Sequence, residues 1–285
     1  MPVCSLPTQR SLRRCVALTL TCLSSPIYLA QSVEAQRVEI GEVRVMNPRR
    51  QMLPEIPGGF TFCRLRYVRT RREQRGQGWR TDYPDADRNL TIRLSQLTPT
   101  PITGWRDGRP GFAVLEATDS ELFRCPFLFS SDVGTASFSA EEAENLRSYM
   151  LKGGFLWVDD FWGDPAWSHW AREIEQILPE YAIEDLPPGH PLFSIVYHVK
   201  EIPQIPSIQY WRQSGGLTSE LGERSATPRL RAIRDETGRL LVLMSYNTDI
   251  ADGWEREGED YAFFAQFSPD AYALGINILV WTMTH

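Results

Sequence analysis

Three groups of polar residues each follow an apolar run that is typical of a buried strand. The groups are Ser131 with Asp132, Asp159 with Asp160, and Asn247 with Asp249. In open α/β sheets, ligands bind beyond the carboxyl ends of the strands, which parallel strands place along one edge. Parallel strands here would give that edge carboxylates able to bind a metal ion or sugar hydroxyls, or to act as an acid and a base. The alternative is structural, because such residues also end strands and cap turns.

Aromatic and further acidic residues accompany these groups. Trp79, Asp82 and Tyr83 stand in the segment WRTDYPDADRN, and capping of the next helix does not explain them. Trp162 and Trp254 follow the second and third acidic groups, and an exposed aromatic face can stack on a sugar or a similar ring. We therefore predict a ligand-binding acidic–aromatic rim. Its candidate residues are Trp79, Asp82, Tyr83, Asp159, Asp160, Trp162, His190, Asn247, Asp249 and Trp254.

Histidine and cysteine offer little for nucleophilic catalysis. His190, which precedes Pro191, is the one histidine beside a predicted rim segment, and a structural role is its alternative interpretation. Cys63 and Cys125 lie within strand-like runs instead of at their ends. The sequence contains no G-x-S-x-G elbow, phosphate-binding glycine loop, dinucleotide fingerprint or zinc-type pair of Cys or His residues. The catalytic residues are therefore unknown, and we assign no metal ion or cofactor.

One short segment resembles half of a calcium-binding loop. Asp85, Asp87 and Asn89 match the pattern D-x-[DN]-x-[DN], but Leu90 replaces the required glycine and Gln96 replaces the closing glutamate. The match fails where the loop geometry is most demanding. We expect Asp85 to cap the following helix instead.

Two strongly charged segments have opposite signs. Residues 249–260 contain six acids and one base, and residues 64–75 contain six arginines. We hypothesise that they neutralise each other across one face, the alternative being a solvated acidic loop. A nucleic-acid site is disfavoured, because no aromatic residues are interleaved with the arginines for base stacking and the chain has a net charge of −6.

The N-terminus has the residue order of a secretory signal peptide. Arginines precede an apolar run at 15–30, and Val33 and Ala35 stand at the −3 and −1 positions before Gln36. The run is interrupted by Pro26 and is shorter than the roughly 20 residues of a membrane span, so a retained anchor is the second interpretation. The predicted segments are a signal peptide at 1–35, a linker at 36–57 and one domain at 58–285.

The predicted export constrains the partners and the cysteines. The domain would work in the periplasm or outside the cell, or remain tethered to the membrane by an uncleaved N-terminal segment. Because residues 1–35 contain three arginines and one glutamate, the remaining chain is more acidic than the whole and repels nucleic acid and anionic lipid. In an oxidising compartment Cys63 and Cys125 can form a disulfide, with two buried free thiols as the alternative.

Strand-like and helix-like segments alternate from residue 58 onward. Strands are predicted within 58–69, 121–131 and 153–158 and in a hairpin around the turn at 235–238. Helices are predicted after Asp85, after a capping box of Ser139 with Glu142, at Asp164-Pro165 and at Ser268-Pro269-Asp270. This alternation predicts an α/β fold in which helices cover a mostly parallel sheet.

Five stretches carry a family resemblance. They are GWRTDYPDADRNLTIRLSQLT, GGFLWVDDFWG, HPLF, YNTDIADGW and ALGINILVWTMTH. Over nearly all of residues 60–285 the chain resembles a bacterial family known as Domain of Unknown Function 4159. The resemblance implies a flavodoxin-like three-layer α/β/α sandwich of the class I glutamine amidotransferase-like type, similar in layout to trehalose-utilisation domains. It implies no reaction, and glutamine hydrolysis is not expected because the Cys nucleophile and its His partner are missing.

Three functions are compatible with these patterns. The first is an exported bacterial domain that binds a small molecule, such as a carbohydrate, or an envelope protein at the rim, without amidotransferase activity. The second is a hydrolase of glycans or envelope material that uses two of the acids, which requires carboxyl groups roughly 5–10 Å apart in a cleft. The third is a purely structural envelope module, in which these groups are buried and fully paired.

Overall fold

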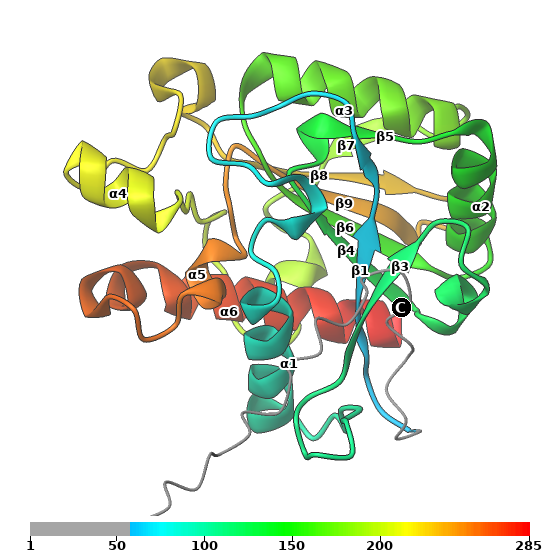
Figure 1. The fold of residues 1–285 in the computed structure, drawn as a ribbon, viewed down its shortest axis with the longest axis horizontal. Helices are drawn as coiled ribbons and strands as arrows, with labels where there is room; N and C mark the ends of the chain where they lie inside the picture. The colour runs from blue at the N-terminus through cyan, green and yellow to red at the C-terminus, as the bar shows by residue number, and fades with distance from the viewer. Residues whose placement is uncertain (1–57) are drawn as a thin grey trace, which may run out of the picture. The chain divides into compact units, whose positions relative to one another are not determined.

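The computed structural model describes residues 58–285, whose central element is a mostly parallel sheet of seven strands. The strands are β1 (Phe62–Arg66), β3 (Phe112–Glu116), β4 (Phe127–Ser131), β6 (Phe155–Phe161), β7 (Ile183–Asp185), β8 (Arg229–Arg234) and β9 (Leu240–Tyr246). They lie in the order β3-β1-β4-β6-β9-β8-β7 (Figure 1). In this sheet β8 runs opposite to the other six strands. The predicted signal peptide at 1–35 and linker at 36–57 lie outside the described residues.

Helices and a small second sheet complete the described part of the chain. The α-helices are α1 (Asp85–Leu97), α2 (Ala140–Leu151), α3 (Gly163–Ile177), α4 (Ile208–Ser214), α5 (Asp252–Glu255) and α6 (Tyr261–Thr284). Short 3-10 helices are η1 (Gly78–Arg80), η2 (Ser120–Arg124), η3 (Val133–Thr135), η4 (Pro191–Ser194) and η5 (Gly222–Ser225). The second sheet pairs β2 (Val68–Arg69) with β5 (Ala136–Ser137). None of the helices within 58–285 has the length and apolar character of a membrane span.

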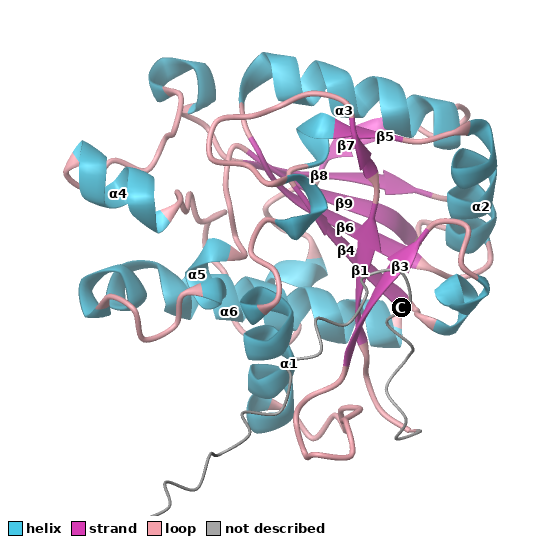
Figure 2. Ribbon diagram, viewed as in Figure 1, coloured by secondary structure: helices cyan, strands magenta, loops and turns pink. Residues whose placement is uncertain are grey.

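The helices form layers on both faces of the sheet (Figure 2). Successive side chains of a strand point to opposite faces. In β4, Phe127 and Phe129 pack in the core that includes α1 and α6, whereas Leu128 packs in the core that includes α2 and α3. The expected three-layer α/β/α sandwich with a mostly parallel sheet is therefore confirmed. Helices α4 and α5 lie to one side of the sheet instead of covering a face (Figure 1).

The main departures from the predicted elements concern helix starts and elements that were not predicted. Helix α6 begins at Tyr261 because the side chain of Asp260 accepts the N–H groups of Ala262 and Phe263. The predicted start at Ser268 is wrong, and Pro269 lies inside the helix. Strand β3, in which four apolar residues precede Glu116, was not predicted, and neither were β7 and α4.

The start of α1 also differs from the prediction, whereas that of α2 agrees with it. Pro84, and not Asp85, is the residue at the N-cap of α1, and no side chain caps that helix start. Asp85 is the first helical residue and forms an ion pair with Arg88. The predicted capping box of Ser139 with Glu142 at the start of α2 is confirmed.

Cys63 and Cys125, whose pairing was left open, form a disulfide. Cys63 lies in β1, and Cys125 lies immediately after η2, two residues before β4 begins. The bond therefore ties the start of β4 to its neighbouring strand on the face covered by α2 and α3.

The hypothesis that the arginine-rich segment neutralises the acidic segment is wrong. Arginines of residues 64–75 form their ion pairs elsewhere: Arg64 with Asp87, Arg66 with Glu116, Arg71 with Glu73 and Arg75 with Glu220. The acidic segment 249–260 instead pairs with Arg93, Arg212 and its own Arg256. Arg64 in β1 is fully buried and pairs with Asp87 of α1, a helix that contacts this strand.

Candidate functional site

Acidic residues from separate loops meet at the carboxyl ends of β4, β6 and β9. These three strands are parallel, so the residues that follow them lie at one edge of the sheet. Carboxylate oxygens of Asp82, Asp160 and Asp249 all lie within 4.8 Å of one another. Asp159 and Asp160 lie inside the last part of β6 instead of following it as predicted, whereas Asp249 does follow β9. The predicted placement of Asp160 and Asp249 at a common edge is confirmed. The loop between η1 and α1 brings Asp82 to the same point.

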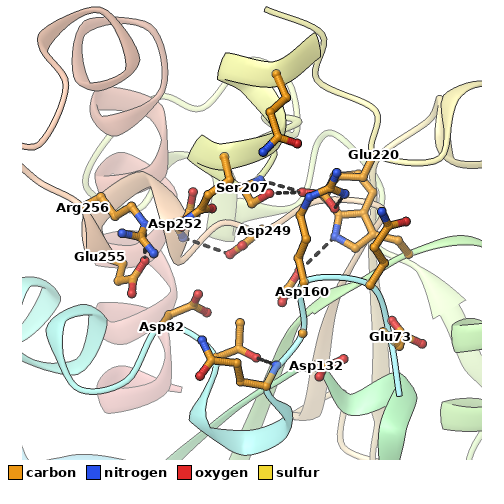
Figure 3. Close-up of a pocket in the computed structure, with 18 residues that line it drawn as sticks. Glu73, Asp82, Asp132, Asp160, Ser207, Glu220, Asp249, Asp252, Glu255 and Arg256 are labelled. Atoms are coloured by element: carbon orange, nitrogen blue, oxygen red, sulfur yellow. Dashed lines mark hydrogen bonds and ion pairs between the residues drawn. The ribbon is translucent and has the colours of Figure 1, made fainter. Parts of the chain in front are cut away.

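These acids line a cavity of about 380 Å³, which we call the acidic cavity (Figure 3). Its acidic residues are Glu73, Asp82, Asp132, Asp160, Glu220, Asp249, Asp252 and Glu255. Arg75 and Arg256 are the basic residues that line it, and Trp162 is the aromatic one. Carboxyl groups therefore outnumber basic groups by eight to two in the lining of one cavity.

The backbone adopts an uncommon conformation around the acidic cavity. Within residues 58–285, the non-glycine residues with positive φ are Arg75 (70°), Asp82 (65°), Asp132 (53°), Asp160 (54°) and Asn247 (61°). All but Asn247 line the cavity. Left-handed backbone is costly for residues with a Cβ, although Asp and Asn tolerate it best. Such conformations cluster at binding and catalytic sites, where the surrounding structure enforces them.

In Asp82 and in Asp249, a hydrogen bond holds one carboxylate oxygen and leaves the other without a protein partner. The hydroxyl of Ser131 donates to Oδ2 of Asp82 at 2.6 Å, and the N–H of Asp252 donates to Oδ1 of Asp249 at 2.9 Å. Asp82 is 5% exposed and Asp249 is 3% exposed. Among the described residues no donor reaches Oδ1 of Asp82 or Oδ2 of Asp249. Both side chains point into the cavity (Figure 3).

Two further acids are held by donors from the cavity wall. The indole Nε1–H of Trp162 donates to Oδ1 of Asp160 at 2.9 Å. The N–H of Gly78 donates to Oδ2 of Asp132 at 2.7 Å. A Cβ atom at Gly76 would lie 2.3 Å from this carboxylate, so glycine permits the close approach of the loop before η1.

Arginines neutralise some of these acids and leave others uncompensated. Nε of Arg256 lies 2.9 Å from Oε2 of Glu255 and 3.6 Å from Oδ1 of Asp252. Arg75 lies 3.5 Å from a carboxylate oxygen of Glu220, and Arg71 lies 3.0 Å from Glu73. The lining acids that form no ion pair within the described part of the chain are Asp82, Asp132, Asp160 and Asp249.

Burial raises the pKa values of the carboxyl groups in the acidic cavity. Burial, followed by the charge of Glu255, raises the pKa of Asp82 to about 8, although the charge of Arg64 opposes the shift. Burial and then the charge of Asp82 raise the pKa values of Asp160 and Asp249 well above the ordinary range. At neutral pH some of these groups therefore hold protons, because burial disfavours the charged carboxylate and neighbouring acids add to that effect.

The pKa values of Glu73 and Asp132, at the side of the cavity nearest η3, are raised less than that of Asp82. Burial raises the pKa of Glu73 to about 7, and the charge of Asp132 adds to that shift. Burial also raises the pKa of Asp132 to about 6, where Arg69 and Arg71 and a backbone hydrogen bond oppose it.

Asp159 lies behind the acidic cavity and does not line it. It is fully buried, and its Oδ2 accepts the N–H of Ala251 at 2.9 Å. Its Oδ1 has no hydrogen-bond partner in the structure. Burial raises its pKa to about 7. Asp159 therefore holds the loop that carries Asp249 and adds negative charge close to the cavity.

The remaining polar candidates of the predicted rim have local structural contacts. Oδ1 of Asn247 accepts the N–H of Gly163 at 2.8 Å, and its Nδ2 donates to the carbonyl of Thr227 at 3.0 Å. His190 packs against Trp281 at 4.9 Å between ring centroids and caps η4. Burial lowers the pKa of His190. Neither residue lines the acidic cavity.

Most of the predicted aromatic surfaces do not face the acidic cavity. Trp254 is fully buried and packs against Trp157 at 5.8 Å between ring centroids, so it offers no face for stacking. Trp79 and Tyr83 pack against each other at 5.7 Å outside the cavity lining. Trp162 alone among the predicted aromatics lines the cavity, with 7% of its surface exposed.

Several lining acids were not among the candidates chosen from the sequence. They are Glu73, Asp132, Glu220, Asp252 and Glu255. Asp132 follows β4 and was placed at the edge of the sheet without being selected. Asp252 and Glu255 follow Asp249 at intervals of three residues, a spacing that puts side chains on one face of a helical turn. That spacing was the available signal, whereas Glu73 and Glu220 lie in loops that carry no pattern.

The acidic cavity offers carboxylate oxygens, which are negatively charged when ionised, as ligands. Carboxylates bind hard cations such as Ca²⁺ and Mg²⁺ and pair with organic cations. No Cys or His side chain lines the cavity, so it lacks the ligands that select softer transition metals. Two carboxyl groups at this separation can also exchange protons with a bound substrate.

Together, the fold and the site define a three-layer α/β domain with an acidic cavity at the carboxyl ends of its parallel strands. Residues 61–283 match the family described as a domain of unknown function, DUF4159, and the chain belongs to this family. The family resemblance drawn from the five sequence stretches is thus confirmed. No match to the chain occurs among functionally curated proteins.

Proposed function

We propose that this domain binds a positively charged ligand in the acidic cavity. The observation that carries the proposal is the charge balance, since eight acids and two arginines line one space of about 380 Å³. This volume lies in the range of small-molecule sites. Burying a carboxylate without a partner is costly, and a cationic ligand removes that cost by pairing with it.

A binding function is better supported than a purely structural one. In a structural module the buried acids would be paired or hydrogen-bonded through both oxygens. Asp82, Asp160 and Asp249 instead form no ion pair within the described chain. The positive φ angles of Asp82 and Asp160 add a conformational cost that packing alone does not require.

A neutral carbohydrate has less support than a cation. Trp162 provides little exposed aromatic surface, and Trp254 provides none. A sugar in this cavity would be held mainly by its hydroxyl groups on carboxylates. An amino sugar, which combines hydroxyl groups with a positive charge, fits both the carbohydrate interpretation and the charge of the cavity.

A carboxylate-dependent hydrolase is the second candidate. The oxygens of Asp82 and Asp249 lie within 4.8 Å, close to the separation of about 5–5.5 Å in retaining glycosidases. With a pKa of about 8, Asp82 is protonated at neutral pH and can act as a proton donor. Hydrolysis of aryl glycosides that is lost in Asp82→Asn would support this candidate, and no turnover of any glycan substrate would remove it.

Amidotransferase activity is not proposed. Cys63 and Cys125 form a disulfide, so neither offers a free thiol as a nucleophile. The disulfide also supports export, because such bonds persist mainly in oxidising compartments. We propose a periplasmic or extracellular location for the domain. Cell fractionation and N-terminal sequencing test this proposal, which predicts cleavage after Ala35 or retention of the segment as an anchor.

Thermal unfolding of the purified chain tests the proposed function. Spermidine, glucosamine, divalent metal ions, glucose and galactose are compared at equal concentrations and equal ionic strength. A ligand that binds the folded state raises the Tm, so we expect at least one cation to raise it and the neutral sugars to have little effect. Asp249→Asn should remove the increase, while Asp107→Asn, at an exposed acid outside the cavity, should retain it. Stabilisation by neutral sugars alone, or by none of these compounds, would overturn the proposal.

A further inference from the structure

We infer that the cation is a single divalent metal ion that prefers oxygen ligands, held by Asp82, Asp160 and Asp249. This inference rests on the proposed function and names the ligand of the same cavity. The three residues come from the loop after η1, the end of β6 and the loop after β9. They are thus carried by separate elements that the folded sheet brings together.

The distances suit one ion. The carboxylate oxygens of the three residues all lie within 4.8 Å of one another. Ligand oxygens lie about 2.3–2.6 Å from Ca²⁺, so two oxygens on opposite sides of the ion are at most about 5 Å apart. One ion can therefore contact all three side chains without a change of the backbone.

Unpartnered oxygens supply the second observation. Asp82 and Asp249 are more than nine-tenths buried and line the cavity. Each has one carboxylate oxygen held by a hydrogen bond and one oxygen that no described donor reaches. Asp82 and Asp249 line the cavity, so a ligand that enters it can reach their free oxygens. These oxygens have lone pairs that no described donor uses, and a metal ion accepts electron pairs from both.

Charge compensation selects this trio over a neighbouring one. Asp82, Asp252 and Glu255 also have carboxylate oxygens within 4.8 Å of one another. Arg256 already lies within 4.0 Å of both Asp252 and Glu255, so that trio has a cation of its own. No arginine or lysine of residues 58–285 forms an ion pair with Asp82, Asp160 or Asp249. The uncompensated trio therefore binds the ion, at one per chain.

The donor chemistry restricts the kind of metal. All three side chains are carboxylates, and the cavity lining contains no Cys or His. Oxygen-only sites suit Ca²⁺, Mg²⁺ and Mn²⁺, whereas imidazole and thiolate ligands select Zn²⁺ and Cu²⁺. Glutamine and serine side chains also line the cavity and offer neutral oxygens, and water can complete the coordination.

Isothermal titration calorimetry of the full chain, freed of metal with a chelator, tests the inference with CaCl₂, MgCl₂ and MnCl₂. We expect saturable binding of one ion per chain for at least one of the three. Tb³⁺, which replaces Ca²⁺ at oxygen sites, gives an independent readout. Because Trp162 is hydrogen-bonded to Asp160, excitation of its indole should sensitise Tb³⁺ emission, and the bound divalent ion should compete it away.

Variants locate the ion within the cavity. Asp249→Asn and Asp160→Asn should each raise the Kd at least tenfold, and two variants keep the test valid if one fails to fold. Asp252→Asn should raise it less, because Arg256 compensates that acid. Asp107→Asn, at an exposed position paired with Arg109, should leave the Kd within twofold. Equal losses in Asp252→Asn and Asp249→Asn would overturn the assignment to this trio.

The outcomes separate this inference from the proposed function. If spermidine or glucosamine binds and none of the three metal ions does, the metal inference fails and the cationic-ligand function stands. If neither organic cations nor metal ions bind, both fail. Binding of two or more ions per chain, with no loss in Asp160→Asn, would also overturn the single site described here.

Discussion

Asp82 and Asp87 are both buried and lie five residues apart, but only Asp87 forms an ion pair within the described chain. The guanidinium of Arg64 donates from Nε to both oxygens of Asp87 at 2.9 and 3.0 Å. Asp82 has one hydrogen bond, from Ser131, and no ion pair. Burial raises the pKa of both carboxyl groups, but beside Asp87 the paired charge of Arg64 opposes the shift directly. The comparison indicates that a compensated buried acid holds the fold together, and an uncompensated one is available to a ligand.

The two sites are connected through the same arginine. Nη1 of Arg64 donates to the carbonyl of Thr81 at 2.9 Å and to that of Trp79 at 3.1 Å. These carbonyls belong to the loop that carries Asp82 into the acidic cavity. The buried pair of Arg64 and Asp87 is thus the support on which the uncompensated acid is positioned.

The largest expected effect comes from breaking the compensated site. Asp87→Ala leaves Arg64 charged, buried and unpaired, which should reduce the free energy of unfolding by about 3–5 kcal/mol. Urea unfolding followed by tryptophan fluorescence measures this loss. The double variant Arg64→Leu with Asp87→Leu should be less destabilised than Asp87→Ala, because it leaves no unpaired charge. A loss below about 1 kcal/mol in Asp87→Ala would show that the pair does not hold the fold.

A change of pH should reveal the uncompensated site. The pKa of Asp82 is about 8 in the folded chain, and a free Asp has a pKa of about 3.9. The folded state therefore holds more protons than the unfolded state between these values, and its stability falls as the pH rises through this window. Each pH unit costs about 1.4 kcal/mol for each such proton.

The corresponding measurement is urea unfolding of the metal-free chain at pH 5.5 and pH 7.5. We expect a lower free energy of unfolding at pH 7.5, by about 2 kcal/mol or more. The lowered pKa of His190 acts in the opposite direction and reduces the net effect. Asp82→Asn should reduce the dependence, and the raised pKa values of Asp160 and Asp249 should maintain the rest of it. Equal stability of the wild type at both pH values would mean that these acids are compensated in a way the structure does not show.

The sequence was sufficient for the layers of the fold because the signals for them are local. The apolar run before Asp159 and the capping box at Ser139 each specify an element through neighbouring residues. Strand β3 was missed because a short run of four apolar residues without periodicity is ambiguous. The start of α6 was missed because Asp260 looked like one more residue of an acidic segment, and its capping bonds are visible only in the structure.

The site was predicted in part, for a topological reason. Parallel strands bring their carboxyl ends together, which placed Asp160 and Asp249 correctly at one edge. The sequence does not show which acids have an arginine beside them, because Arg256 and Arg75 reach their partners through loop conformations. Burial is equally hidden, so Trp254 looked like a stacking surface although it is a core residue.

The substitution Asp160→Asn should have the smallest effect on stability, and it tests most directly the comparison between acids with and without an ion pair. Asp160→Asn removes one uncompensated carboxylate and keeps an oxygen at Oδ1 that accepts the indole N–H of Trp162. The metal-free variant should be more stable than the wild type at pH 7.5, by about 0.5–2 kcal/mol, because Asn has no carboxyl group that must take up a proton or be buried as a charge when the chain folds. The same substitution should weaken metal binding, so stability and binding should change in opposite directions.

The direction of the change in stability distinguishes an acid of a binding site from an acid that supports the fold. Replacing an acid that supports the fold lowers stability whatever the ligand, as expected for Asp87. Replacing an acid that is kept for a ligand raises the stability of the metal-free chain, and the wild type regains the advantage only when the ion is present. Urea unfolding of Asp160→Asn and wild type, each with and without saturating Ca²⁺, measures all four values. A loss of stability in metal-free Asp160→Asn would place this acid with Asp87, among the groups that hold the fold.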